Sequence, residues 1–334
     1  MNPPLPLQEL SAALGAFPKL RVLVLGDLFL DEYLEGEMFE ISREGPIPVV
    51  KLASRVRTAG AAGNLACSLK NLGAQVSVLS LVGEDPAGEE LLRQLEKKNI
   101  GTESIIRLPS KPTLTYTKIR ARVANAPSRE ILRLDVLPEE PIDNSLEDRV
   151  LSVLGAVASK LDAIIVLDQV HHLVTRRILD ELPAIAAAHK LFLQGSSRER
   201  LAEFHDFNLV IPNDQEAREA LGIPGEKLPA GELAGKLKQQ GGHREILLTL
   251  GPDGMAALGE DREEAILLPS LAGEVVDVTG AGDAVSSAVL LGRLAGWDLH
   301  SAASVASHCA SIAISRAGTH HVTLQELQEA LGGN

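Results

Sequence analysis

The sequence predicts an α/β protein in which a mostly parallel sheet carries helices on both faces and a small second β-sheet is attached. Two patterns indicate this. From about residue 144 onward, helical periodicity alternates with short apolar runs, which is typical of β–α–β units. In the stretches 32–58 and 103–135, apolar and polar residues alternate instead, which predicts half-exposed strands outside the main core.

Composition limits the class of protein and of partner. The chain has 334 residues, of which 45% are hydrophobic and 23% charged, so it is long enough to bury a large core. Its 32 Lys and Arg against 45 Asp and Glu give a net charge of −13, which argues against nucleic acid or an anionic membrane as the main partner. Cys67 and Cys309 lie in small-residue helical patterns and are expected to be buried thiols.

The beginning of the sequence has no basic region followed by an apolar core, and no apolar run is long enough to span a membrane. We therefore expect a cytoplasmic protein. No repeat, linker or low-complexity block interrupts the chain, so a single domain over 1–334 is expected, with the second sheet formed discontinuously by 32–58 and 103–135.

The elements are expected in a regular order. The first hundred residues predict a helix at 6–16, a buried strand at 21–27, a helix ending near 72, a strand from 76 and a helix from 86 to 100. The later part predicts helices at 144–159, 173–188, 213–221 and 229–240, strands at 162–168, 190–194 and 207–213, a strand–turn–strand unit at 246–258, and a helix and turn within 300–319.

The segment 275–291, VVDVTGAGDAVSSAVLL, is the strongest chemical signal. Gly280, Ala281 and Gly282 leave the start of a helix without bulky side chains, where free N–H groups and the helix dipole favour an anion such as phosphate. Asp283 would lie beside that anion, which suits a base that takes a proton from an attacking hydroxyl. The simpler alternative is an ordinary helix start with Gly in the turn and Asp as a cap.

Two separate motifs resemble those of a known family. The string DVTGAGD followed by SSAVL resembles the second signature of the PfkB and ribokinase family of sugar kinases, and AGAAGNLACSLKNLGAQVSVLSLVG at 59–83 resembles the first. The resemblance implies a ribokinase-like three-layer sandwich with a β-sheet lid, and transfer of the γ-phosphate of ATP, with Mg²⁺, to a sugar hydroxyl. By the resemblance, Asp283 accepts the proton of the sugar hydroxyl, and the backbone amides of 280–282 bind the γ-phosphate. Asp277 and Thr279 resemble the family's loop for a monovalent cation such as K⁺.

The acceptor sugar is expected near the end of the first strand, where open α/β sheets bind ligands. Asp27 and Asp31 both follow that strand, and Asp31 matches the family's sugar-binding aspartate. One of the two could instead only cap the turn. Gly60 permits close approach of a ligand, and Asn64 offers a donor and an acceptor to a hydroxyl, although Asn64 at a helix start could be purely structural.

Strings in the second sheet narrow the resemblance. ISREGPIPVV and ILRLD are similar to those of bacterial heptose-7-phosphate kinases, so a heptose 7-phosphate is the favoured acceptor, with other sugar phosphates or a nucleoside left open. Lys118, Arg120, Arg122 and Arg133 make this region basic, and Arg133 is the candidate for a substrate phosphate. The alternative is a solvated strand face. Because the family's lid often mediates dimerisation, the resemblance also implies a homodimer.

The nucleotide side is expected after the later strands. Asn213 and Glu216 match the family's N-x-x-E motif, whose oxygens act on Mg²⁺ indirectly through its waters. An Asn cap with a capping-box Glu explains the same spacing, and both roles can hold at once. By resemblance the nucleotide loop and the adenine pocket include Thr249, Gly251, Gly254 and Ser307.

Several positions depart from the heptose kinases. His171 stands where a lysine is expected, Gln194 and Ser196 stand for Asp and Lys, and Ser307 stands for Asn. Losing two positive side chains near the phosphates would weaken stabilisation of the transition state, for which His171 and Arg198 could compensate in part. A second hypothesis is therefore a weak or inactive ribokinase-fold protein that binds sugar or nucleotide. The intact Asp283 favours the kinase, and GDLFLD lacks the GxGxxG of a dehydrogenase.

Overall fold

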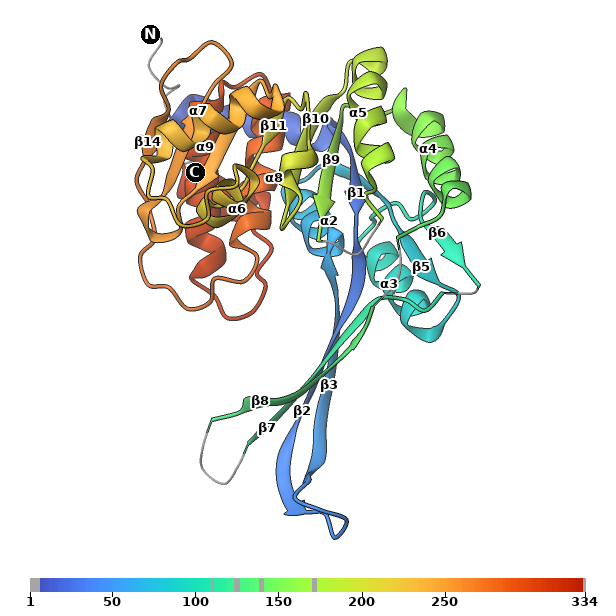
Figure 1. The fold of residues 1–334 in the computed structure, drawn as a ribbon. Coiled ribbons are helices and arrows are strands. Elements are labelled where there is room, and N and C mark those ends of the chain that lie inside the picture. Colours follow the sequence, from blue (N-terminus) through green and yellow to red (C-terminus); the bar gives the residue numbers. More distant parts are fainter. Residues whose placement is uncertain (1–6, 110, 123–126, 138–140, 170–172, 333–334) are drawn as a thin grey trace.

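The computed structural model describes residues 7–109, 111–122, 127–137, 141–169 and 173–332 (Figure 1). Its centre is an eight-stranded sheet in the order β14-β13-β12-β11-β10-β9-β1-β4. Neighbouring strands from β4 to β12 are parallel, and β13 and β14 are antiparallel additions at one edge. The strands are β1 (Arg21–Gly26), β4 (Gln75–Leu79), β9 (Ala163–Asp168), β10 (Phe192–Ser197), β11 (Leu209–Val210), β12 (Glu245–Thr249), β13 (Met255–Leu258) and β14 (Ile266–Leu268).

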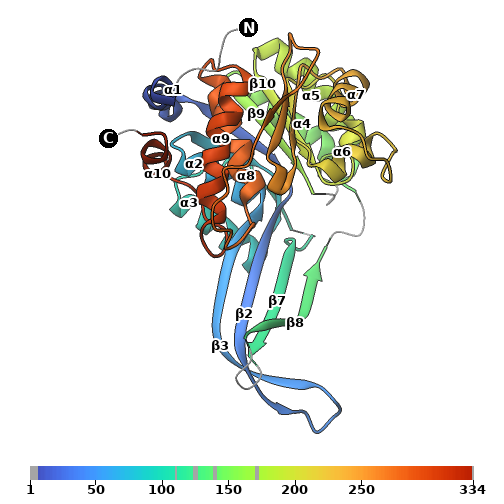
Figure 2. The same cartoon turned by 90° about the vertical axis from the view of Figure 1, so that its left-hand side faces the viewer.

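Helices cover both faces of this sheet (Figure 2). One buried apolar cluster joins the sheet to α2, α3, α8 and α9, and the other joins it to α4, α5, α6 and α7. This three-layer arrangement confirms the predicted fold class. The helices are α1 (Leu7–Ala13), α2 (Ala62–Asn71), α3 (Pro86–Lys97), α4 (Asn144–Ala158), α5 (Arg176–His189), α6 (Asp214–Ala220), α7 (Ala230–Gly241), α8 (Ala281–Leu294), α9 (Leu299–Ile314) and α10 (Leu324–Ala330), with short 3₁₀ turns at Leu14–Lys19, Leu201–Glu203 and Gly251–Asp253.

A second sheet projects away from this body and is called the lid below (Figures 1 and 2). Its strand order is β3-β2-β7-β8, with bounds Leu28–Ile41 for β2, Pro48–Ala61 for β3, Thr115–Arg122 for β7 and Arg129–Val136 for β8. Only Asp27 separates β1 from β2, and β3 ends directly before α2. The base of the lid therefore meets the body at the carboxyl end of the central strand β1.

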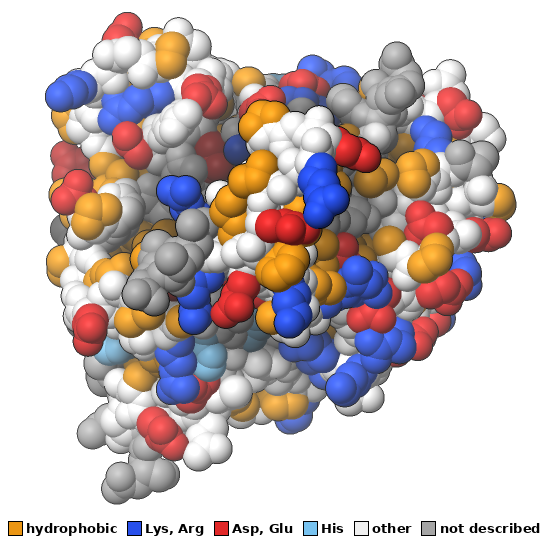
Figure 3. Space-filling view, turned by 90° about the horizontal axis from the view of Figure 1, so that it is seen from below, with side chains coloured by type: hydrophobic (Ala, Val, Ile, Leu, Met, Phe, Trp, Pro, Cys, Tyr) orange, Lys and Arg blue, Asp and Glu red, His pale blue; other side chains and the backbone are white. Residues whose placement is uncertain are grey.

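The lid leaves much apolar surface uncovered. Viewed from below, hydrophobic side chains lie exposed among charged ones (Figure 3). A single isolated protein rarely leaves so many large apolar side chains exposed in one element. The exposed large apolar side chains of the lid, counted with Leu137 directly after β8, are Phe39, Ile41, Ile47, Leu52, Val56, Leu132, Leu134, Val136 and Leu137.

The structure differs from the predicted elements at a few places. The region expected to complete the second sheet contributes to it only from Thr115, because β6 (Ile106–Leu108) pairs with β5 (Leu81–Gly83) and buries Ile106. The first helix ends at Ala13 and tightens into a 3₁₀ turn that contains Pro18. Both cysteines are buried and free, as predicted. In the described ranges, no helix is both long and apolar enough to cross a membrane.

Candidate active site

The start of α8 is shaped by Gly280. Its φ of 84° is left-handed, and a Cβ there would lie 2.9 Å from the Thr319 methyl carbon, so a side chain would be both strained and crowded. The Ala281 N–H donates to the Val278 carbonyl at 3.2 Å, and regular helix bonding begins with the Ala284 N–H to the Gly280 carbonyl at 2.9 Å. This turn redirects the chain into the helix.

The turn leaves a set of N–H groups for a ligand. Within the described ranges, the N–H groups of Gly280, Gly282 and Asp283 have no acceptor. Nothing lies within 4 Å of the position that a Cβ of Gly282 would take, so the first turn of α8 is open to an anion. The expected set was 280–282. The Ala281 N–H is instead used inside the turn, and that of Asp283 takes its place.

Asp283 has the electrostatics of a base poised near neutral pH. It is half-buried in the first turn of α8, and its carboxylate forms no hydrogen bond or ion pair with any described residue. Burial raises the pKa of Asp283 to about 7 from its ordinary value of 3.8. A carboxylate with this pKa can take a proton from a hydroxyl at physiological pH.

The loop before α8 is braced by Asp277. Its Oδ1 accepts from the Thr279 N–H at 2.9 Å and its Oδ2 from the Gly318 N–H at 3.0 Å, and these bonds hold the pKa of Asp277 below its usual value. The loop is thereby tied to the segment after α9. Each carboxylate oxygen keeps a further lone pair that a cation could use. The geometry therefore fits a monovalent-cation site at Asp277 and Thr279, and this role stays a prediction.

A cavity of about 680 Å³ opens beside the start of α8. Its volume suits a small-molecule cofactor, and its walls are mostly apolar. Gly254, with a φ of 94°, forms part of the wall, and a Cβ there would collide with the Leu268 carbonyl. The cavity brings together most of the residues predicted for the nucleotide and its phosphate: Asn213, Thr249, Gly251, Gly254, Ala281, Gly282 and Ser307.

The loop at 270–278 also lines this cavity, and its residues before Val275 were not predicted to belong to the site. Leu271, Val275 and Val278 line the cavity from a segment with no regular periodicity, and Ile314 lines it from α9. Apolar residues in a glycine-containing loop directly before the GAGD string were the available signal. Such walls suit the flat apolar faces of a purine.

The Asn213–Glu216 pair forms a capping box. Asn213 Oδ1 accepts from the Glu216 N–H at 2.9 Å, and Glu216 Oε2 accepts from the Asn213 N–H at 2.8 Å. Burial raises the pKa of Glu216. The structural alternative is therefore present, and the magnesium role of Glu216 remains a prediction. In the part of the chain that the structure describes, no group of three or more His, Cys, Asp or Glu residues is placed to hold a metal ion.

On the sugar side, Asp31 lies where the lid meets the body and is 9% exposed. Its Oδ2 lies 2.7 Å from the position that a Cβ of Gly60 would take, and the same Cβ would collide with the ring of Phe29. Gly60 is thus required for Asp31 and Phe29 to hold their places. The prediction that Asp31 and Gly60 belong to one site agrees with this geometry.

Asp27 is hydrogen-bonded to backbone N–H groups of neighbouring segments. It is buried, its Oδ2 accepts from the Gln169 N–H at 2.8 Å, and its carbonyl accepts from the Ala62 N–H at 3.0 Å. These bonds join the ends of β1 and β9 to the start of α2, and whether Asp27 also contacts the sugar stays a prediction. Asn64, in the first turn of α2, is half-buried and has no side-chain hydrogen bond within the described ranges.

Arg133 already has partners in the lid. Its Nε donates to Asp135 Oδ1 at 2.7 Å, and its guanidinium lies 4.3 Å from the centre of the Tyr116 ring. Tyr116 in turn packs edge-on against Phe29, with ring centres 4.7 Å apart. A substrate phosphate at Arg133 would therefore have to share the guanidinium with Asp135, or replace it.

Comparison with known proteins decides the family. The model of the family described as pfkB family carbohydrate kinase matches residues 42–326. The chain belongs to the pfkB family of carbohydrate kinases. It is 33% identical over 317 residues to the bifunctional protein HldE of Desulfatibacillum aliphaticivorans and 33% identical over 320 residues to that of Syntrophotalea carbinolica. The matches cover 94% and 95% of this chain but 64% of each relative, so the chain spans just under two thirds of their length.

Solved structures place the pfkB chain in the ribokinase-like fold. A carbohydrate kinase from Agrobacterium tumefaciens superposes with a TM-score of 0.74 at 22% identity, covering 94% of this chain and 97% of that one. The Arabidopsis thaliana ribokinase complexed with ribose and ATP superposes with a TM-score of 0.70 at 17% identity, covering 94% and 99%. At these identities the likeness shows the fold alone.

The pfkB chain's departures from the heptose-kinase pattern are neutral side chains held by backbone. Gln194 Nε2 donates to the Ser286 carbonyl of α8 at 3.1 Å, and Ser196 Oγ donates to the Ile211 carbonyl at 3.3 Å. Ser307 Oγ donates within α9 to the Ala303 carbonyl at 3.2 Å. None of these three supplies positive charge. His171 lies outside the described residues.

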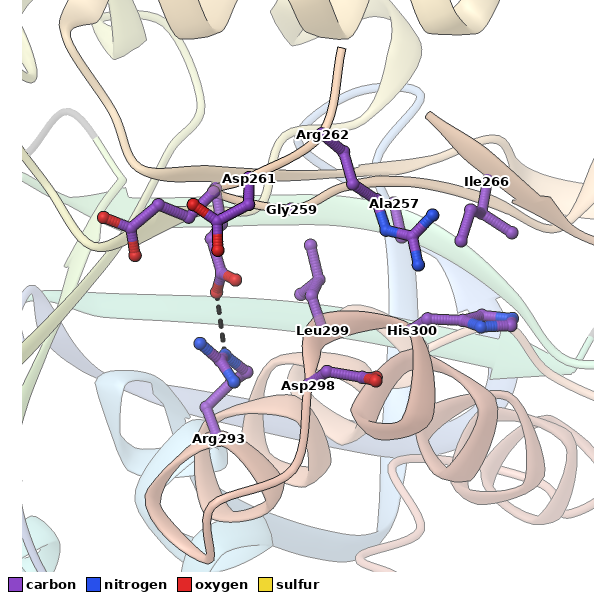
Figure 4. A pocket seen from close by; sticks show the side chains of 11 residues that line it. Ala257, Gly259, Asp261, Arg262, Ile266, Arg293, Asp298, Leu299 and His300 are labelled. Atoms are coloured by element: carbon purple, nitrogen blue, oxygen red, sulfur yellow. Dashed lines mark hydrogen bonds and ion pairs between the residues drawn. The ribbon is translucent and has the colours of Figure 1, made fainter. Parts of the chain in front are cut away.

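A second cavity, of about 190 Å³, lies at the other end of strand β12 (Figure 4). Its deepest charges are already paired, because Arg293 Nε lies 2.8 Å from the buried Glu245 carboxylate. Arg262 faces it from the loop after β13, and Asp298 and His300 face it from the start of α9. Glu245 begins β12 and Thr249 ends it, so this cavity is separate from the α8 site.

Proposed function

We propose that this chain is an ATP-dependent sugar kinase that transfers the γ-phosphate to a hydroxyl of a sugar or sugar phosphate, with heptose 7-phosphate as the favoured acceptor. The observation that carries the proposal is Asp283, whose pKa of about 7 belongs to a carboxylate beside the open N–H groups of a helix start. A purely structural cap would have no need of a half-buried, unpaired acid at an anion site.

In the proposed reaction, the base of ATP lies in the 680 Å³ cavity and its γ-phosphate lies at the open N–H groups of α8. Asp31 orients the acceptor sugar at the base of the lid. Asp283 takes the proton of the attacking hydroxyl, and the N–H groups stabilise the charge on the phosphoryl oxygens. Arg133 is the proposed contact for a phosphate on the sugar.

Mg²⁺, bound with the nucleotide, would neutralise charge between the phosphates. We propose that Asn213 and Glu216 orient its waters, because Asn213 lines the cavity and Glu216 is hydrogen-bonded to it. We further propose that a K⁺ ion binds at the Asp277–Thr279 loop, because that loop leads directly into Gly280. With ATP as the donor, we propose that the enzyme works in the cytoplasm, with no nucleic-acid or membrane partner.

We also propose that two copies associate through the lid. The support is the set of nine large apolar side chains exposed there, each between 41% and 68% exposed. Covering them against a second lid would remove this surface from water in both copies. The alternative function, a weak or inactive sugar- or nucleotide-binding module, rests on the replacements at His171, Gln194 and Ser196, and the described two, Gln194 and Ser196, are neutral.

The test is a coupled assay of ADP release with ATP, Mg²⁺ and K⁺ across sugars and sugar phosphates that include heptose 7-phosphate. The kinase proposal expects one acceptor to give turnover well above the ATP-only background. Nucleotide binding measured by calorimetry, without turnover on any acceptor, would instead support the binding module.

A further inference from the structure

Lys118 lies in the lid strand β7 on the face that carries Asp31. The strand register places Tyr116 beside Asp31, and Lys118 beside Tyr33. Residues two apart on one strand share a face, so these four side chains belong to the same side of the lid. The next step along β7 brings Arg120 beside Glu35, further from the body.

The ammonium of Lys118 makes two directed contacts. Nζ donates to Asp31 Oδ1 at 3.0 Å and to the Tyr33 hydroxyl at 3.1 Å, and it lies 4.7 Å from the centre of the Tyr33 ring. The side chain is 23% exposed, and that of Asp31 is 12% exposed. Burial lowers the pKa of Lys118, but the bonds to Asp31 and Tyr33 outweigh it and raise the pKa overall, so the charge is retained.

These contacts leave one N–H donor of Lys118 and one carboxylate oxygen of Asp31 for a ligand. An ammonium has three N–H donors, and two are used. Asp31 Oδ1 is bonded to Lys118, while Oδ2 has no hydrogen bond to any described residue and is not among the buried polar atoms. A carboxylate acceptor and an ammonium donor therefore lie about one hydrogen-bond length apart at the base of the lid.

Resting on the proposed kinase function, we infer that Lys118 is a specificity-determining residue that, with Asp31, recognises a vicinal pair of hydroxyls on the acceptor sugar. One hydroxyl donates to Asp31 Oδ2, and its neighbour accepts from Lys118 Nζ. Neighbouring hydroxyl oxygens on a sugar ring are separated by roughly 3 Å, so the pair can reach a carboxylate and an ammonium that are themselves in hydrogen-bond contact, as Asp31 and Lys118 are at 3.0 Å. A sugar that lacks either hydroxyl loses one of the two hydrogen bonds to a charged group.

The test compares substrates and variants together. We would measure kcat/KM for the accepted sugar and for each of its monodeoxy analogues, with the wild type and with Lys118→Met. Arg120→Met is the matched control, because Arg120 is paired with Glu35 at 2.9 Å and has no contact with Asp31. Lys118→Arg, which keeps the charge, and a thermal melt of each variant guard against a folding defect.

We expect the wild type to lose roughly 10- to 150-fold in kcat/KM on the analogue that lacks the accepting hydroxyl, the range for a hydrogen bond to a charged group. Lys118→Met should lose a similar factor on the parent sugar and then no longer distinguish that analogue. The KM for ATP should stay the same, and Arg120→Met should behave as the wild type. Equal discrimination by Lys118→Met and the wild type would overturn the inference, as would equal losses in Lys118→Met and Arg120→Met.

Dissociation constants of the same sugars for the same variants, measured by calorimetry, separate this inference from the proposed function. If the wild type binds a sugar but transfers no phosphate, the kinase proposal fails, and the inference is judged on binding alone. Loss of discrimination in the dissociation constants of Lys118→Met would then support it, and unchanged discrimination would overturn it.

Discussion

Replacing Asp283 with asparagine should stabilise the fold at neutral pH while it removes the activity. The pKa of Asp283 is about 7 in the folded chain, against an ordinary value of 3.8. A carboxyl with a raised folded pKa holds its proton more tightly when folded, so ionisation at high pH destabilises the native state. The penalty is absent below pH 3.8, grows between pH 3.8 and 7, and is constant above pH 7.

The size of the effect follows from the same values. A pKa difference of about three corresponds to about 4 kcal/mol of unfolding free energy at pH 7 and above, and to about 1.5 kcal/mol at pH 5. Asp283→Asn removes the ionisable group and should recover stability of that order. Its turnover should fall by about 10²- to 10⁴-fold, the usual contribution of a general base.

The assay is urea unfolding of the wild type and of Asp283→Asn at pH 5 and pH 8. We expect the variant's gain to be larger at pH 8 by about 2.5 kcal/mol. Asp261→Asn, at an exposed loop position, is the control and should change stability by less than about 0.5 kcal/mol at either pH. A variant that gains nothing at pH 8, or the same amount at both values, would refute the desolvation argument.

Four further outcomes follow from the geometry. The wild-type kcat/KM should fall as pH drops below about 7, since the base must be unprotonated; a flat profile from pH 5 to 8 would contradict the role of Asp283. Gly60→Ala should raise the sugar KM at least tenfold by displacing Phe29 and Asp31, with Gly45→Ala in the lid hairpin, where a Cβ meets nothing within 4 Å, as control. Gly280→Ala should lower the unfolding free energy by about 1–2 kcal/mol, measured by urea, whereas Gly235→Ala in α7 should not; equal effects would exclude left-handed strain as the cause. Leu134→Asp should shift a dimer to monomer in sedimentation velocity and Leu267→Asp, outside the lid, should not; a wild-type monomer would count against the lid interface.

The helix start at α8 was predictable because its signal is local. Gly280 and Asp283 are separated by two small residues, and the left-handed φ of Gly280 is a property of that turn alone. What the string could not show is which N–H groups stay open. The Ala281 N–H turns back to the Val278 carbonyl, and this depends on the path of the loop before it.

The lid was predictable as exposed strands but not in its pairing. Strands β5 and β6 are three residues long and about 25 residues apart, so their partnership depends on which edge is free after the body has folded. The cavity loop at 270–278 has no period of 2 or 3.6, so periodicity could not place it in the site, and only its position before the GAGD string pointed to it. The Lys118–Asp31 contact is set by the parallel register of β2 and β7, which brings together residues 87 positions apart.

The most direct test of the central claim is transfer of labelled phosphate from γ-³²P-ATP to the accepted sugar in a single turnover, with the wild type and Asp283→Asn side by side and ATP binding checked for both. The account predicts rapid transfer by the wild type, and transfer slowed at least 100-fold by the variant with ATP affinity unchanged. Transfer at the wild-type rate by Asp283→Asn would contradict the assignment of Asp283 as the base.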